Sequence, residues 1–184
     1  MVNIYIEKSP LHVIVRSGLE VYCNTYHRET LGCLYGKNID KKSGRIYIVE
    51  NAQPYQEAER MPSNIMVDHH SQGVLELGIE NTIGDYHSHT KYSTNNGFRY
   101  PCLALGDDDI QDMLKNPENI AVLLTVKKTN RRWPLKLYHD EIYGTILFNN
   151  TNYLIHIRAY YLENRRKRIA NLMIQKRLLK GIFE

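Results

Sequence analysis

The sequence predicts an α/β domain in which a mixed β-sheet is flanked by helices. Strand-like and helix-like segments are mixed along the chain, an order typical of layered α/β architectures. The 184 residues suffice for one domain with a sizeable core, and no internal repeat or Pro/Gly/Ser-rich linker marks a boundary. We therefore expect a single domain over residues 1–184, with its core at about 10–160 and a helix at its C-terminal end.

The expected elements follow from the spacing of apolar residues. Alternation or a short apolar run predicts strands at 2–7, 11–15, 31–36, 45–50, 82–89, 120–126, 133–138, 142–148 and 153–160. Helical spacing predicts helices at 17–27, 64–78, 107–115 and 163–184. Ser17 and Glu20 have the spacing of a capping box at the start of the first helix. The strands at 120–126 and 133–138 are expected to form a hairpin, and 91–100 a surface loop.

The basic charge of the chain is concentrated at its C-terminal end. The net charge is +4, yet residues 163–184 alone hold seven basic and two acidic side chains, a local charge of +5. The rest of the chain has 17 basic and 18 acidic side chains (24 − 7 and 20 − 2), a charge of −1. A basic helix is most often a solvated face, so nucleic acid is not an expected partner.

Cysteine content and hydropathy favour a cytoplasmic protein. The three cysteines form no CxxC motif, and residues 1–8 alternate like a strand rather than forming the apolar segment of a signal peptide. No apolar run approaches the roughly 20 residues of a membrane-spanning helix, so no membrane association is expected. The sequence carries no signal of an oligomeric state.

A His-x-His pair is the strongest chemical signal in the chain. Thr82, Ile83 and Tyr86 favour a strand around His87 and His89. Side chains alternate along a strand with period two, so both imidazoles leave the backbone on the same face. The pair could therefore bind one metal ion together.

A catalytic zinc ion takes three protein ligands and leaves one position open for water. Three acidic residues, Asp107, Asp108 and Asp109, open the helix at 107–115, and any of them could be the third ligand. A general base is also needed beside the open position. Glu29 is the candidate, because it precedes a glycine-containing strand where backbones can approach closely.

These residues resemble the JAMM (MPN+) metalloprotease family over about 10–127. Two motifs and an Asp-Ile pair at a helix start carry the resemblance: Glu29-x-x-Gly32-x-Leu34-x-Gly36 and Gly84-x-x-His87-Ser88-His89. The resemblance implies a cytidine-deaminase-like JAB/MPN fold around one zinc ion per chain. It implies His87, His89 and Asp109 as ligands and Glu29 as the base. It also implies an isopeptidase that removes ubiquitin-like or small modifier proteins from their targets.

Three departures from the family pattern bear on activity. Thr90 replaces the usual proline, and the segment up to Asp109 is about nine residues longer, an insertion within 90–105. Gly106 stands where the family has a serine that helps to stabilise the oxyanion, a donor worth about 3 kcal/mol in the transition state. Ser93, Thr94 and Tyr100 are candidate replacements. The alternative is a weak or inactive scaffold for protein interactions.

A second enzyme class shares part of this motif. Residues 85–93 also resemble the opening motif of PHP-type phosphoesterases. Those sites bind several metal ions and need many more His, Asp and Glu ligands after the opening motif. The only histidines that follow residue 92 in this chain are His139 and His156. The peptidase interpretation is therefore favoured.

Overall fold

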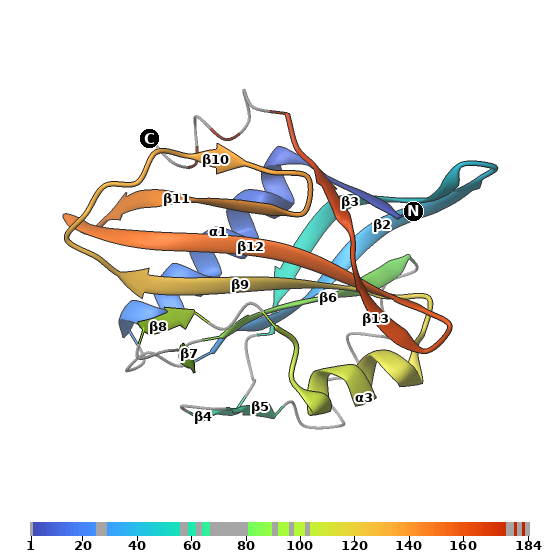
Figure 1. Cartoon of the computed structure of the whole chain (residues 1–184), viewed down its shortest axis with the longest axis horizontal. Helices are drawn as coiled ribbons and strands as arrows, with labels where there is room; N and C mark the ends of the chain where they lie inside the picture. The colour runs from blue at the N-terminus through green and yellow to red at the C-terminus, as the bar shows by residue number, and fades with distance from the viewer. Residues whose placement is uncertain are drawn as a thin grey trace.

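The structure, a computed structural model, describes residues 2–24, 29–55, 59–61, 64–66, 81–89, 92–95, 98–101, 104–175, 179 and 182. The fold is mostly β, and a curled mixed sheet of ten strands dominates it (Figure 1). The sheet order is β10-β11-β12-β9-β6-β2-β3-β1-β14, with β13 paired to β12. The expected α/β domain, and with it the cytidine-deaminase-like architecture, is therefore wrong.

The strands of the sheet run as follows: β1 Asn3–Ile6, β2 Leu31–Lys41, β3 Gly44–Pro54, β6 Thr82–His89, β9 Ile120–Lys128, β10 Lys136–Leu137, β11 Glu141–Phe148, β12 Thr151–Glu163, β13 Arg166–Ile169 and β14 Asn171–Met173. Two small hairpins lie outside it: β4 Glu59–Met61 with β5 Asn64–Met66, and β7 Tyr92–Asn95 with β8 Phe98–Pro101. The helices with described bounds are α1, Lys8–Asn24, and α3, Asp107–Lys115.

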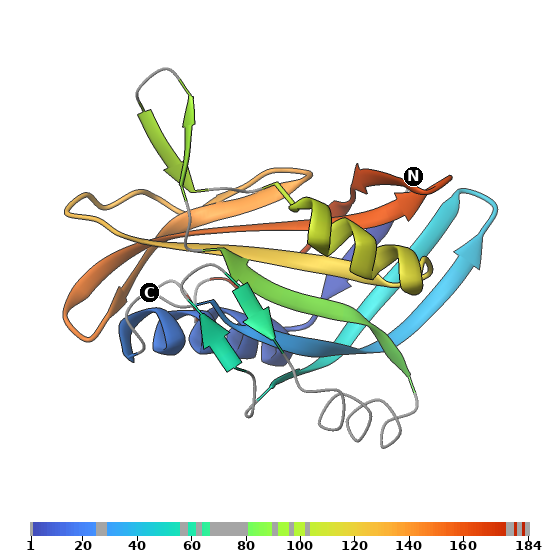
Figure 2. The ribbon, with the colours of Figure 1, turned by 90° about the horizontal axis from the view of Figure 1, so that it is seen from below.

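Helix α1 covers one face of the sheet, and α3 lies on the other (Figure 2). The larger apolar core joins α1 to the strands and includes Leu124 of β9. A smaller core joins α3 to the opposite face through Met113 of the helix and Leu123 of β9. Adjacent residues of β9 thus serve opposite faces, as the alternation of a strand requires.

Helix α1 replaces the predicted strand at 11–15. It confirms the predicted helix at 17–27 over residues 17–24, and residues 25–27 lie outside the described part of the chain. Its buried residues recur at helical spacing: Pro10, Leu11, Ile14, Val15, Gly18, Leu19 and Tyr22. Ser17 is therefore inside the helix rather than at its start, and its Oγ donates to the carbonyl of Ile14 at 3.2 Å. A Cβ at Gly18 would collide with Leu124 Cδ2, so glycine permits the close approach of α1 to β9.

Strand β6 lies in the middle of the sheet and brings the candidate site there. It pairs antiparallel with β2, where Leu31 faces His87, and parallel with β9, where Leu123 faces His87. A Cβ at Gly84 would collide with the Ile120 carbonyl, so this glycine lets β6 and β9 approach. The predicted strand at 82–89 is confirmed.

The predictions for the second half of the chain are partly confirmed. Helix 107–115 is confirmed. The strands predicted at 142–148 and 153–160 are also found, as β11 and β12, and they are joined by a hairpin turn at Asn149 and Asn150, which both have positive φ. The hairpin of 120–126 with 133–138 is wrong, because β9 pairs with β12 while β10 pairs with β11.

Three further predictions fall partly on residues that the structure does not describe: the surface loop at 91–100, the helix at 64–78 and the basic helix at 163–184. The surface loop at 91–100 contains the strands β7 and β8. The helix expected at 64–78 is wrong at 64–66, which form β5, and its remainder lies outside the described residues.

The basic helix at 163–184 is wrong up to 175. Asn164 and Arg165 turn the chain with φ of 51° and 60°, and β13 and β14 follow. Leu179 and Ile182 are helical, and the neighbouring residues 176–178, 180–181 and 183–184 lie outside the described part of the chain.

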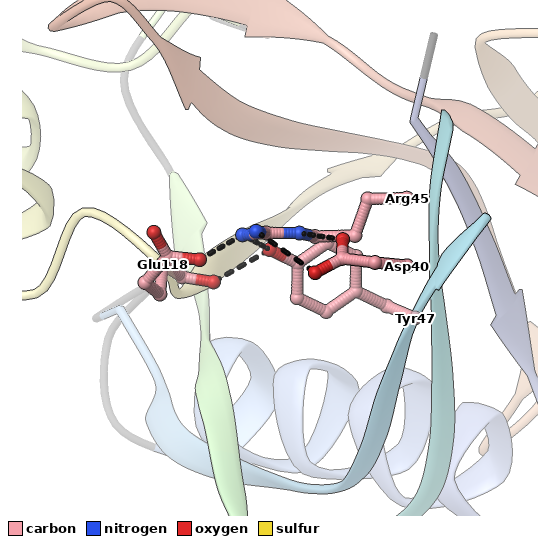
Figure 3. A network of polar contacts seen from close by, with 4 residues as sticks. All are labelled: Asp40, Arg45, Tyr47 and Glu118. Carbon is pink, nitrogen blue, oxygen red and sulfur yellow. Dashed lines mark hydrogen bonds and ion pairs between the residues drawn. The ribbon is translucent and has the colours of Figure 1, made fainter. Parts of the chain in front are cut away.

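A polar network ties the β2–β3 hairpin to the segment that follows α3 (Figure 3). The Arg45 guanidinium forms ion pairs with Asp40 on the hairpin and with Glu118 before β9. The Tyr47 hydroxyl donates to the Glu118 carbonyl at 2.6 Å. The network fixes the far end of the α3 segment against the sheet. In the part of the chain that the structure describes, no helix has the length and apolar character needed to cross a membrane.

Candidate metal centre

Three predicted ligands meet at the end of β6. The ligand atoms of His87, His89 and Asp109 all lie within 4.8 Å of one another, so the group could hold a metal ion. Asp109 Oδ1 is 3.5 Å from His87 Nε2, and Asp109 Oδ2 is 3.5 Å from His89 Nε2. In a tetrahedral zinc site with bonds of about 2.0–2.2 Å, neighbouring ligand atoms are about 3.3–3.6 Å apart.

The backbone of Gly106 holds the third ligand. Gly106 is the N-cap of α3, and its N–H donates to Asp109 Oδ2 at 2.7 Å. Asp109 is in the first turn of the helix, where the helix dipole favours negative charge. Asp107 and Asp108 occupy the same turn but are exposed, and neither belongs to the group of ligand atoms. The structure therefore selects Asp109 from the three candidates.

His87 has the orientation that a metal ligand needs. Its side chain is 11% exposed, and its Nδ1 is 3.2 Å from Asp85 Oδ1. Among the described residues, its buried Nε2 has no hydrogen-bond partner. A buried nitrogen without a partner is costly, and a metal ion at this position would satisfy it. The residues therefore fit the metal that the sequence predicts.

Opposite charges dominate the electrostatics of the centre. Burial disfavours a charged His87, but the carboxylates of Asp109 and Asp85 outweigh this effect and raise the pKa of His87 to about 10. Burial likewise disfavours the charged form of Asp109, which acts to raise its pKa. His87, His89 and the Gly106 N–H nevertheless hold the pKa of Asp109 well below its usual range.

Glu29 is brought to the same face of the sheet. It is 8% exposed and lies two residues before Leu31, which faces His87 across the β2–β6 pair. The same antiparallel register, continued by two residues, sets Glu29 opposite His89. Residues opposite each other on antiparallel strands share a face, so this register favours a Glu29 carboxylate on the side of the His–Asp group.

Two hydrogen bonds tie β6 to Thr30, the residue that follows Glu29. The Thr30 N–H donates to Ser88 Oγ at 2.8 Å, and the Ser88 N–H donates to the Thr30 carbonyl at 2.9 Å. Ser88 is 2% exposed and points to the face opposite the ligands. The serine within the His-Ser-His motif therefore has a structural role that the sequence analysis did not assign.

Other expected contributors are only partly described. Ser93, Thr94 and Tyr100 lie on the β7–β8 hairpin, which projects from the sheet on the side of α3 (Figure 2), but their side chains are outside the described part of the structure, as is Thr90. Asp85 was not predicted. Its signal in the sequence is the pattern Asp-x-His-x-His. Asp85 lies two residues before His87, so on a strand its side chain leaves the same face as the two histidines.

Comparison of the sequence with protein families and with curated proteins gives no match. No protein-family model matches the sequence, and no curated protein matches it significantly. The case for a metal centre therefore depends on the residues themselves.

Proposed function

We propose that this protein is a zinc-dependent peptidase of the JAMM type that cleaves isopeptide bonds. The observation that carries the proposal is the meeting of His87, His89 and Asp109, together with a buried Nε2 atom of His87 that has no hydrogen-bond partner among the described residues. Glu29, which the continued register of β2 against β6 sets opposite His89, is the proposed fourth element, a carboxylate that acts as the base.

The roles follow from the chemistry of each group. A bound zinc ion supplies a Lewis acid and brings the pKa of a water molecule toward neutrality. Glu29 takes the proton from the attacking water and returns it to the leaving amine. His87, His89 and Asp109 hold the metal on a strand and a helix start that the sheet keeps in place.

The proposed substrate is a ubiquitin-like or small modifier protein joined to a lysine of its target. The resemblance of the two motifs to the JAMM family supports this substrate class. The reaction requires no nucleophilic cysteine, because water attacks the carbonyl carbon directly.

A panel of modifier–lysine conjugates tests the proposal. Zinc-loaded wild type should cleave at least one conjugate, and chelation should abolish the cleavage. Glu29→Gln should bind zinc as wild type does but lose about 10²–10⁴-fold in rate, the usual contribution of a general base. Glu50→Gln, at an exposed site on β3, is the matched control and should retain full activity. Equal rates for wild type and Glu29→Gln would refute the assignment of the base.

A catalytically weak or inactive scaffold is the second candidate. It is favoured by Gly106, which offers no side-chain donor where the family has a serine. Zinc bound at one equivalent without cleavage of any conjugate would support the scaffold. Absence of zinc binding would contradict the metal centre itself.

A further inference from the structure

We infer that Asp85 is a positioning residue that orients His87 for metal binding, an inference that depends on the proposed metal centre. The carboxylate of Asp85 accepts a hydrogen bond from Nδ1 of His87 at 3.2 Å. The other ring nitrogen, Nε2, is directed at Asp109 and has no hydrogen-bond partner among the described residues.

The hydrogen bond determines which nitrogen of the ring is available. An ionised carboxylate only accepts hydrogen bonds, so Nδ1 keeps its proton and Nε2 is the nitrogen that gives up its proton when a metal ion binds. Nε2 then has a free lone pair, which is what a metal ion requires. The bond also restricts rotation of the ring, because the side chain can no longer turn without losing its partner.

The strand geometry supports this role. Asp85 precedes His87 by two residues on β6, so the two side chains leave the same face of the sheet. The Asp85 side chain is 40% exposed, so it has space to bend over the ring without breaking the core. Carboxylates that bind the second nitrogen of a ligand histidine raise its basicity and commonly contribute 10–100-fold to metal affinity.

Metal titration of full-length variants tests the inference, with Zn²⁺ and Co²⁺ as probes. Asp85→Ala should bind both ions about 10–100-fold more weakly than wild type. Asp85→Asn should fall between the two, because its amide oxygen still accepts the hydrogen bond without the charge. Asp108→Ala is the matched control, since it removes a nearby exposed carboxylate that does not contact the histidines. Its affinity should remain within about twofold of wild type, as expected for a solvent-screened charge.

A second measurement separates positioning from general loss of structure. In the Co²⁺-loaded protein, the exchangeable Nδ1 proton of His87 should give a shifted NMR signal. The Asp85→Ala substitution should speed exchange of this proton with water, whereas Asp108→Ala should not.

The outcomes distinguish the inference from the proposed function. Wild-type affinity in Asp85→Ala, or equal losses in Asp85→Ala and Asp108→Ala, would overturn the positioning role and leave the metal centre intact. Failure of the wild type to bind either ion would overturn the proposed function, and with it this inference.

Discussion

Ser88 Oγ accepts a hydrogen bond from the backbone N–H of Thr30 at 2.8 Å, and this contact ties the residue before β2 to the end of β6 that carries His87 and His89. The two residues on either side of Ser88 are the proposed ligands His87 and His89, and the residue before Thr30 is Glu29. One buried hydroxyl therefore connects the segments that carry the ligands and the proposed base.

Replacing this serine should separate catalysis from metal binding. Ser88→Ala leaves the Thr30 N–H buried without its acceptor, which should cost about 1–3 kcal/mol in the free energy of unfolding. Zinc affinity should change little, because the hydroxyl points away from the ligands, whereas the cleavage rate should fall as Glu29 loses its fixed position. Urea denaturation, zinc titration and conjugate cleavage measure the three effects. A loss of affinity as large as the loss of rate would contradict this separation.

Gly106 offers a direct test of the missing family serine. The residue has φ −70° and ψ 174°, which any amino acid adopts, and an added Cβ would meet Asp109 Oδ2 at an acceptable 3.4 Å. Gly106→Ser therefore fits, and its hydroxyl would supply a donor of a type worth about 10²–10³-fold in rate. We expect a rate gain of at least about tenfold with zinc affinity unchanged.

Gly106→Ala is the control for this experiment, because it adds the Cβ without the hydroxyl. It should leave the cleavage rate near that of wild type. Equal gains in the serine and alanine variants would show that backbone restriction, rather than the hydroxyl, raises the rate.

The metal-free centre should make stability depend on pH. Burial opposes charge on His87, but Asp109 and Asp85 outweigh it and raise its pKa from 6.5 to about 10 in the folded protein. Because the folded pKa is the higher one, this stabilisation is complete below pH 6.5 and is lost as the pH rises toward 10. We expect the urea midpoint of the metal-free wild type to fall across this window more steeply than that of His87→Gln.

Asp109 acts in the opposite direction. Its pKa is depressed in the folded state, mainly by His87 and His89 against the effect of burial, so its contribution is present above its ordinary pKa and lost in acid. Asp109→Asn should therefore flatten the pH profile at both ends. Parallel profiles for wild type and both variants would contradict the ion pairing of the cluster.

Local patterns were sufficient to predict the grouping of His87, His89 and Asp109 but not the fold. The His-x-His strand, the acidic first turn of α3 and the strand after Glu29 are each encoded within a few residues, and all three are confirmed as elements. The residues alone predicted that His87 and His89 meet an aspartate of this turn, and the resemblance implied Asp109. The hydrogen bond from the Gly106 N–H that holds Asp109 there required coordinates.

The errors arose where local patterns were ambiguous or pairing was distant. The run Val13-Ile14-Val15 is β-branched like a strand, yet tertiary packing of Leu11 and Leu19 against the sheet makes it helical. The turn at Asn164 and Arg165 lacks the glycine that would have marked a hairpin. The pairing of β9 with β12 rather than its neighbour depends on contacts that sequence periodicity does not encode.

Substitutions of two adjacent leucines of β9 should distinguish packing that supports the metal centre from packing that only stabilises the fold. Leu123 and Leu124 are both fully buried, but Leu123 packs in the core beneath α3 and Leu124 in the core beneath α1. Each substitution by alanine should cost about 2–5 kcal/mol in the free energy of unfolding.

Only Leu123→Ala should also weaken zinc binding, because it loosens the packing that holds α3 and therefore Asp109 against the histidines. Leu124→Ala is the matched control, of the same size and burial on the same strand. Denaturant titration and zinc titration of both variants, under conditions where both remain folded, make the comparison. Equal affinities in the two variants would mean that the sheet and the Gly106 cap position Asp109 without help from the core beneath α3.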